Sequence, residues 1–156
     1  MRHRELQELL NALVGEFVVA KTIAGNSISL WFSVEPRHPD ARRLWIDPPW
    51  RILTPTGIET TSYGFPMDKE NDESESHYRT RFERACTNSD SLKGPIVKVV
   101  TIDALTGDLA VDFIDGRSLQ VFAVDLAYEN WHYTDHRRGK RYGVLVAGVE
   151  VEDIDA

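Results

Sequence analysis

The chain has 156 residues, a length that fits one domain built around a single hydrophobic core. Apolar residues make up 42% of the chain, so its composition does not predict disorder. Its net charge of −7 disfavours nucleic-acid binding, which depends on basic surfaces. We expect one β-rich domain over residues 1–149 and an acidic, frayed tail over residues 150–156.

The cellular location can be inferred only from what the sequence lacks. Cys86 is the only cysteine, so no internal disulfide can form, which fits a reducing compartment; we interpret Cys86 as a half-buried thiol. The first ten residues are charged and resemble no signal peptide, and no segment has the ~20 apolar residues of a membrane span. We therefore expect a cytoplasmic protein.

Two helices are expected. The first lies near residues 4–13, where four leucines recur at helical spacing. The second lies near residues 74–86, where acidic residues at the start complement the helix dipole and Tyr78, Phe82 and Ala85 form an apolar stripe. The hydrophilic stretch over residues 66–76 is expected to be a mobile loop that leads into this second helix.

Most of the remaining chain is typical of strands. The clearest is 27–33, in which Ile28, Leu30 and Phe32 alternate with three serines and Trp31, so that Trp31 shares the serine side of the strand. Further strands are expected over 17–23, 43–47, 50–54, 58–62, 96–103, 109–114, 117–124, 129–133 and 142–146. About nine strands with one or two short helices predict an α+β fold, mostly β. We expect a strongly bent antiparallel sheet or an open β-barrel with the helices closing one side.

The register of one hairpin can be predicted from its side chains. A two-residue loop would pair Val111 with Gln120 and place the apolar residues of the two strands on opposite faces. A three-residue loop over residues 114–116 instead pairs Val111 with Leu119. It also places Gly116 where the backbone needs a positive φ, so we predict this loop.

No catalytic motif is recognisable. The sequence contains no G-x-S-x-G elbow, no nucleotide-binding glycine motif and no Cys–His signature, so we expect neither an enzyme nor a cofactor. His132 and His136 have the spacing of zinc ligands on a helix, but a strand and a basic turn are predicted there, so we expect no metal site. The basic turn over residues 136–141 has no assigned role.

Two groups of residues could form a binding surface. Asp112 lies in the middle of a strand, on the face opposite Val111, and with Gln120 it could give that face a polar surface for a partner. Large aromatic residues cluster over 44–51 and 128–133. They indicate either core packing, with Arg51 paired to a carboxylate such as Glu129, or an interaction site.

The order of several segments also resembles a known family. LVG, SISLWF and LWIDPPWRI are followed by LKGPIVKVVTIDALTGDLAVDFIDGRSLQVF and then by YENW. This order is similar to that of a family of small, mostly uncharacterised bacterial proteins, some of which are grouped with the immunity proteins of wall-associated, contact-dependent toxins. The resemblance covers about residues 13–134, and its most specific pieces lie at 50–51, 106–109 and 128–131. It implies an intracellular antitoxin that binds a toxin domain.

We therefore predict a protein-binding module, specifically an immunity protein whose acidic surface complements a basic toxin domain. One alternative is a small-ligand-binding protein or enzyme with a pocket in the mouth of a barrel, lined by Trp45, Trp50, Arg51, Tyr128 and Trp131. Another is an accessory protein that homodimerises through an edge strand. The candidate binding or family-motif residues are Trp45, Trp50, Arg51, Asp108, Asp112, Gln120, Tyr128, Glu129 and Trp131.

Overall fold

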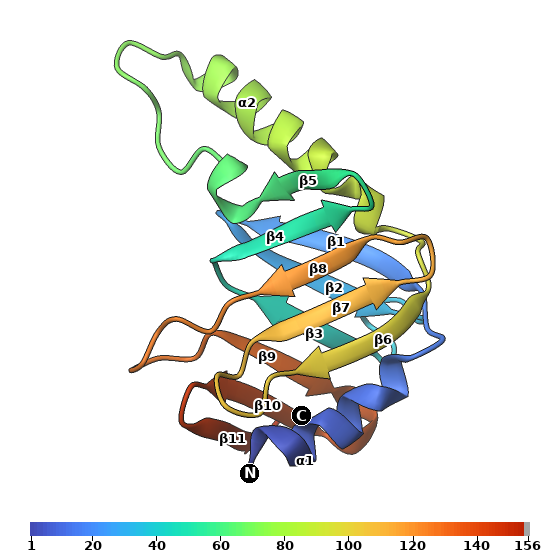
Figure 1. The fold of residues 1–156 in the computed structure, drawn as a ribbon. Helices are drawn as coiled ribbons and strands as arrows, with labels where there is room; N and C mark the ends of the chain where they lie inside the picture. The colour runs from blue at the N-terminus through green and yellow to red at the C-terminus, as the bar shows by residue number, and fades with distance from the viewer. Residues whose placement is uncertain (155–156) are drawn as a thin grey trace.

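The computed structural model describes residues 1–154, in which eleven strands form two antiparallel sheets (Figure 1). The large sheet has the order β1-β2-β3-β9-β10-β11, and the small sheet has the order β5-β4-β8-β7-β6. The large sheet comprises β1 (Val18–Ala24), β2 (Ser27–Phe32), β3 (Arg42–Ile46), β9 (Trp131–Asp135), β10 (Lys140–Leu145) and β11 (Gly148–Asp153). The small sheet comprises β4 (Trp50–Thr54), β5 (Gly57–Thr61), β6 (Val97–Ile102), β7 (Leu109–Phe113) and β8 (Ser118–Val121).

The α+β, mostly β class is confirmed, but the expectation of one bent sheet or an open barrel is wrong, because the strands form two separate sheets. The chain leaves the large sheet after Ile46 and enters the small sheet at Trp50. Pro48 and Pro49 occupy this crossing and have no N–H to continue the ladder of β3. The small sheet is thus formed by a segment that lies between β3 and β9 in the sequence.

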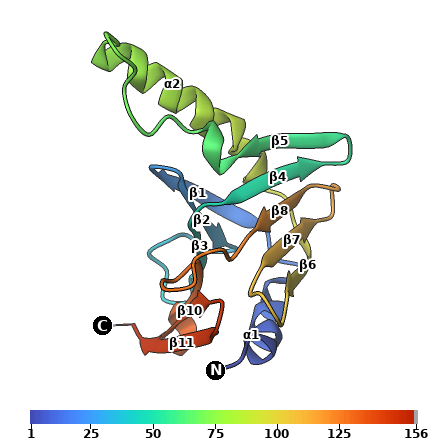
Figure 2. The ribbon, with the colours of Figure 1, turned by 60° about the vertical axis from the view of Figure 1, so that its left-hand side comes forward.

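The core lies between the two sheets, which face each other in Figure 2. Alternate residues of each strand point into it, as the period of two along a strand requires. From the large sheet come Ile28, Leu30, Phe32, Leu44, Ile46, Tyr133 and Val144, and from the small sheet come Ile52, Val100, Leu109, Val111, Phe113, Leu119 and Val121. The residues between them point to the two outer faces, and these outer faces carry the candidate sites.

Helix α1 (His3–Leu10) lies beside β6 and β11, where it closes one open end of the space between the sheets (Figure 2). Its apolar stripe is fully buried through Leu6 and Leu10, and a 3-10 turn continues it to Leu13. The side-chain amide of Gln7 pairs with the free edge of β6: Nε2 donates to Val100 O at 2.8 Å, and Oε1 accepts from Ile102 N at 2.7 Å. One glutamine thereby satisfies backbone groups that an edge strand leaves unpaired.

Helix α2 (Glu75–Asn88) projects from the sheets and buries only Ala85 fully (Figure 1). Phe82 packs on Phe65 with their ring centroids 6.1 Å apart. At the helix end, the ammonium of Lys21 donates to Cys86 O and to Ser89 Oγ, each at 2.6 Å, and it also pairs with Asp90. A cation at a helix C-terminus is favourable because the carbonyl groups there carry partial negative charge.

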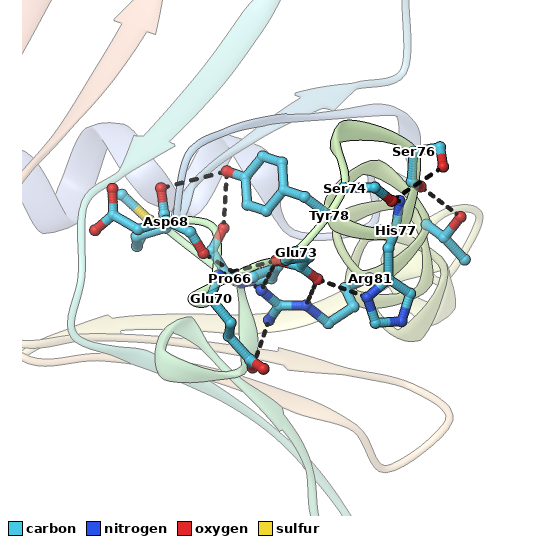
Figure 3. A network of polar contacts seen from close by, with 11 residues as sticks. Pro66, Asp68, Glu70, Glu73, Ser74, Ser76, His77, Tyr78 and Arg81 are labelled. Carbon is cyan, nitrogen blue, oxygen red and sulfur yellow. Dashed lines mark hydrogen bonds and ion pairs between the residues drawn. The ribbon is translucent and has the colours of Figure 1, made fainter.

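The hydrophilic stretch before α2 is bonded to the helix by a polar network (Figure 3). The Glu73 carboxylate accepts from Arg81 Nε at 2.6 Å and Nη2 at 2.7 Å, and it lies 2.9 Å from His77 Nδ1. Ser74 caps the helix by accepting from His77 N, and Tyr78 donates to the carbonyl of Pro66. No helix among the described residues is long and apolar enough to cross a membrane.

The predicted register of the β7–β8 hairpin is confirmed. Val111 lies opposite Leu119, Leu109 lies opposite Val121, and Gly116 has a φ of +88°. Both pairs point into the core. The hydrophobic alternation of the two strands and the conformation of the turn therefore determine the same register.

The segment that was expected to be a frayed tail continues as a strand. Residues 150–153 are the last four of the six residues of β11, and Val151 lies opposite Tyr142 of β10. Charged side chains stabilise this edge, because Lys140 pairs with Asp153 and Arg141 with Glu152. Residues 155 and 156 lie outside the described part of the chain.

Candidate functional site

Two of the candidate residues belong to the core. Trp50 and Trp131 are almost completely buried, and each indole N–H donates to a backbone carbonyl, of Asn26 at 2.8 Å and of Gly107 at 2.9 Å. A buried Trp needs such a partner for its N–H. These two side chains therefore pack the interior, and they do not line a pocket mouth together with Trp45 and Tyr128.

Trp45 and Glu129 lie on the outer face of the large sheet. We use the name aromatic face for the patch formed there by Trp31, Arg43, Trp45, Glu129, His132 and Arg141. The strand pairing explains why they meet: Trp45 lies opposite His132 in the β3–β9 ladder, and Trp31 lies opposite Arg43 in the β2–β3 ladder. Side chains that face each other across a ladder lie close enough to contact.

Arg43 lies between two indole rings. Its guanidinium carbon is 4.8 Å from the ring centroid of Trp45 and 5.2 Å from that of Trp31, and its Nε donates to Ser29 Oγ at 2.7 Å. His132 stacks on Trp45, with the ring centroids 6.2 Å apart and the planes 6° from parallel. Burial and the nearby charge of Arg141 lower the pKa of Arg43. The cation is thus partly desolvated and is held by π-faces.

An ionic cluster borders the stacked rings. The Glu129 carboxylate accepts from Arg141 Nη2 at 2.6 Å and lies 2.7 Å from His132 Nδ1. Burial favours a higher pKa for Glu129, but the hydrogen bonds and charges of His132 and Arg141 together outweigh it and lower that pKa. Gly143 makes the arrangement possible, because a Cβ at this position would overlap with the Glu129 carboxylate.

The aromatic face is suited to binding. Its indoles, imidazole and guanidinium are fixed by stacking and by hydrogen bonds, so little side-chain entropy remains to be lost when a partner covers them. Trp and Arg are also the residue types that contribute most to protein–protein affinity. None of its members is a hydroxyl or thiol nucleophile placed beside a base, as covalent catalysis would require.

A second group of candidate residues lies on the outer face of the small sheet. Arg51, Asp108 and Gln120 line a groove of about 370 Å³ there. Arg51 Nε donates to Gln120 Oε1 at 2.8 Å, so the suggested pairing of Arg51 with Glu129 is wrong; Glu129 pairs with Arg141. Asp112 lies on the same outer face, outside the groove lining, opposite Ser118.

Tyr128 lies apart from both groups, on the loop between β8 and β9. Its side chain is 73% exposed, and Leu126 on the same loop is 80% exposed. The loop backbone is nevertheless fixed. Asp125 Oδ1 accepts from the N–H groups of Ala127 and Tyr128, and Asn130 Oδ1 accepts from Asp125 N. The sequence pointed to Tyr128 through the family motif and gave no indication of exposed Leu126.

Sequence reasoning also missed Trp31, Arg43 and His132 as members of a binding surface. The alternation of residues 27–33 did place Trp31 on the serine side of its strand, and this was the available signal. His132 lies within the aromatic cluster over 128–133, but its own spacing from His136 points only to a metal site. Among residues 1–154, no three His, Cys, Asp or Glu side chains are grouped as a metal site would require.

Comparisons of the chain with protein-family models, curated proteins and solved structures found no match.

Proposed function

We propose that this chain is a protein-binding module of the immunity type, which neutralises a toxin domain by covering it with the aromatic face. The observation that carries the proposal is the position of Arg43 between Trp31 and Trp45 on an outer sheet face. Monomeric proteins bury most tryptophan for packing, so two partly exposed indoles around one cation favour an interface.

The carboxylates at the β11 edge of this face support a basic partner. Glu150 and Glu152 of β11 lie on the same outer side as Gly143 and Arg141, the residues that they pair with. The chain as a whole carries a net charge of −7. Carboxylates at the rim and a negative net charge accelerate the approach of a basic domain, whereas the desolvated centre sets the rate at which it leaves.

The proposal requires a toxin domain encoded by a gene next to that of this protein, and the test is a binding experiment with this domain in purified form. We expect a complex by size exclusion at micromolar concentration. We further expect Trp45→Ala and Arg43→Ala each to weaken binding at least about 30-fold, which corresponds to the ~2 kcal/mol of an interface hot spot. Asp112→Asn, on the opposite outer face, is the matched control and should leave the affinity unchanged.

Two results would contradict the proposal. One is the absence of a complex at micromolar concentration. The other is a complex whose affinity the two aromatic-face variants leave intact while both remain folded by circular dichroism. A chain that forms a dimer by itself, and keeps the dimer in Trp45→Ala because Trp45 lies on the central strand β3, would instead support the alternative of an accessory protein that homodimerises through an edge strand.

A further inference from the structure

The groove on the outer face of the small sheet is a consequence of one small side chain. Strand pairing sets Arg51, Gln120, Ala110 and Thr101 side by side in a row across β4, β8, β7 and β6. Three of these residues have long or branched side chains, whereas Ala110 has only a methyl group. The row is therefore hollow above Ala110, and the hollow measures about 370 Å³, which is within the range of small-molecule sites.

One end of the groove presents a cation without an anion. The guanidinium of Arg51 lies 5.1 Å from the ring centroid of Phe122, and its Nε is occupied by Gln120. Its two terminal nitrogens make no hydrogen bond or ion pair with any described residue. Stacking on Phe122 and the bond to Gln120 hold the plane of the guanidinium in place, so a fixed pair of donors is available for a carboxylate.

The other end presents anions without a cation. Asp108 Oδ1 accepts from Ala123 N at 2.7 Å, and Asp103 Oδ1 accepts from the N–H groups of Leu105 and Thr106. These backbone donors orient both carboxylates and lower the pKa of Asp103. Within residues 1–154, neither carboxylate forms an ion pair, and each has an oxygen with no hydrogen-bond partner.

The opposite charges do not neutralise each other, because the sheet separates them. Arg51 is on β4, whereas Asp108 directly precedes β7, and β8 lies between these strands. Two strand spacings put the backbones about 10 Å apart. Phe122 and Ala110 supply apolar surface in the middle of the groove.

We propose that this groove binds a small zwitterion, with its carboxylate on Arg51 and its ammonium on Asp103 and Asp108. A simple anion would bind to Arg51 but would be repelled by the two carboxylates. A simple cation would bind to the carboxylates but would be repelled by Arg51. An aliphatic chain between the two charges would lie over Ala110 and against Phe122. The groove is on the small sheet and the aromatic face is on the large sheet. The test of zwitterion binding is therefore independent of the test of toxin binding.

The experiment titrates the isotope-labelled protein with 6-aminohexanoate and follows its amide resonances. We expect shifts centred on Ala110 and Gln120, with a dissociation constant on the order of 1 mM, as befits a ligand of this size. Hexanoate and hexylamine, which each retain one of the two charges, should bind at least about tenfold more weakly.

Variants then locate the site. Ala110→Leu fills the hollow without altering a charge and should abolish the shifts, and Asp108→Asn keeps the acceptor for Ala123 N and should weaken binding about tenfold. Asp112→Asn, on the same face outside the groove, should bind normally. The proposal is overturned if 6-aminohexanoate causes no shifts in the groove, if hexanoate or hexylamine binds as tightly, or if folded Ala110→Leu binds like the natural sequence.

Discussion

The two helices are attached to the same β-structure by different forces. Helix α1 buries Leu6 and Leu10 completely between the sheets, whereas α2 buries only Ala85. At its start α2 is held by Glu73, and at its end by Lys21. These two side chains are only 3% and 4% exposed. Apolar burial involves no titrating group and is not screened by salt, whereas charged hydrogen bonds depend on pH and are weakened by screening. The two helices should therefore respond differently to the same change in solution.

The comparison also shows where each helix gains its stability. The α1 leucines contribute to the core that holds both sheets together, so losing one of them destabilises the whole fold. The α2 contacts involve few other elements, so losing one of them should release a projecting segment and leave the sheets intact. The four predictions below test this difference, beginning with the largest expected effect.

Leu10→Ala should lower the free energy of unfolding by about 2–5 kcal/mol, because it removes a fully buried side chain and leaves a cavity. Urea unfolding followed by circular dichroism measures this loss. The control is Glu8→Ala on the exposed side of the same helix, which should change stability by less than about 0.5 kcal/mol. A loss below about 1 kcal/mol for Leu10→Ala would show that α1 is not an integral part of the core.

Lys21→Met should lower the opening free energy of α2 by about 1–3 kcal/mol, because the hydrogen bonds to Cys86 O and Ser89 Oγ disappear while the aliphatic stem remains. Hydrogen exchange should become faster in α2 and stay unchanged in α1. Lys93→Met is the matched control, since Lys93 pairs with the same Asp90 from an exposed position. Equal acceleration in both helices would contradict a local role for Lys21.

Acid should loosen the start of α2 before it affects α1. The hydrogen bonds that Glu73 accepts from Arg81 hold the pKa of Glu73 at about 2, below the ordinary glutamate value of 4.5. A carboxyl whose pKa is lower in the folded state stabilises that state above pH 4.5, and the contribution disappears as the pH falls toward 2. Amide exchange across α2 measures this loss. Glu73→Gln should remove the pH step, and a step that persists in this variant would assign it to another group.

Lys69→Ala should have the smallest effect. The ammonium of Lys69 lies 2.9 Å from Glu75 at the start of α2, but about half of the Lys69 side chain remains in solvent. Exposed ion pairs contribute about 0–1 kcal/mol, and salt screens them. Limited proteolysis of the stretch before α2 should therefore be nearly unchanged. Cleavage as fast as in Glu73→Gln would mean that this exposed pair matters as much as the covered Glu73.

Local patterns were enough to predict both helices and most of the hairpins. The alternation around Val111 and the position of Gly116 define the β7–β8 register, and leucine spacing locates α1. Both depend on residues that are close in sequence. The whole of β11 (Gly148–Asp153) was missed, because the acidic residues from Glu150 onward suggested a solvated tail. Their pairing with Lys140 and Arg141 becomes apparent only once β10 lies alongside.

The candidate site could be predicted only in part, for the same physical reason. Trp45 and Glu129 were singled out from two separate segments, but nothing local indicates that Trp45 stacks on His132. That contact depends on the pairing of β3 with β9, two strands that are far apart in the sequence. The groove was equally hidden, because it depends on the small side chain of Ala110 between residues of neighbouring strands.

The pairing of β3 with β9 also has a consequence for the order of folding. All five strands of the small sheet and the whole of α2 lie between these two strands in the sequence. The hairpins on either side can form early, whereas the β3–β9 ladder must close a very long loop, which slows such contacts. Trp45 meets His132 only across this ladder. The binding that we propose for the aromatic face would therefore require this slow ladder, and a chain that had not closed it would lack the stacked pair of Trp45 and His132.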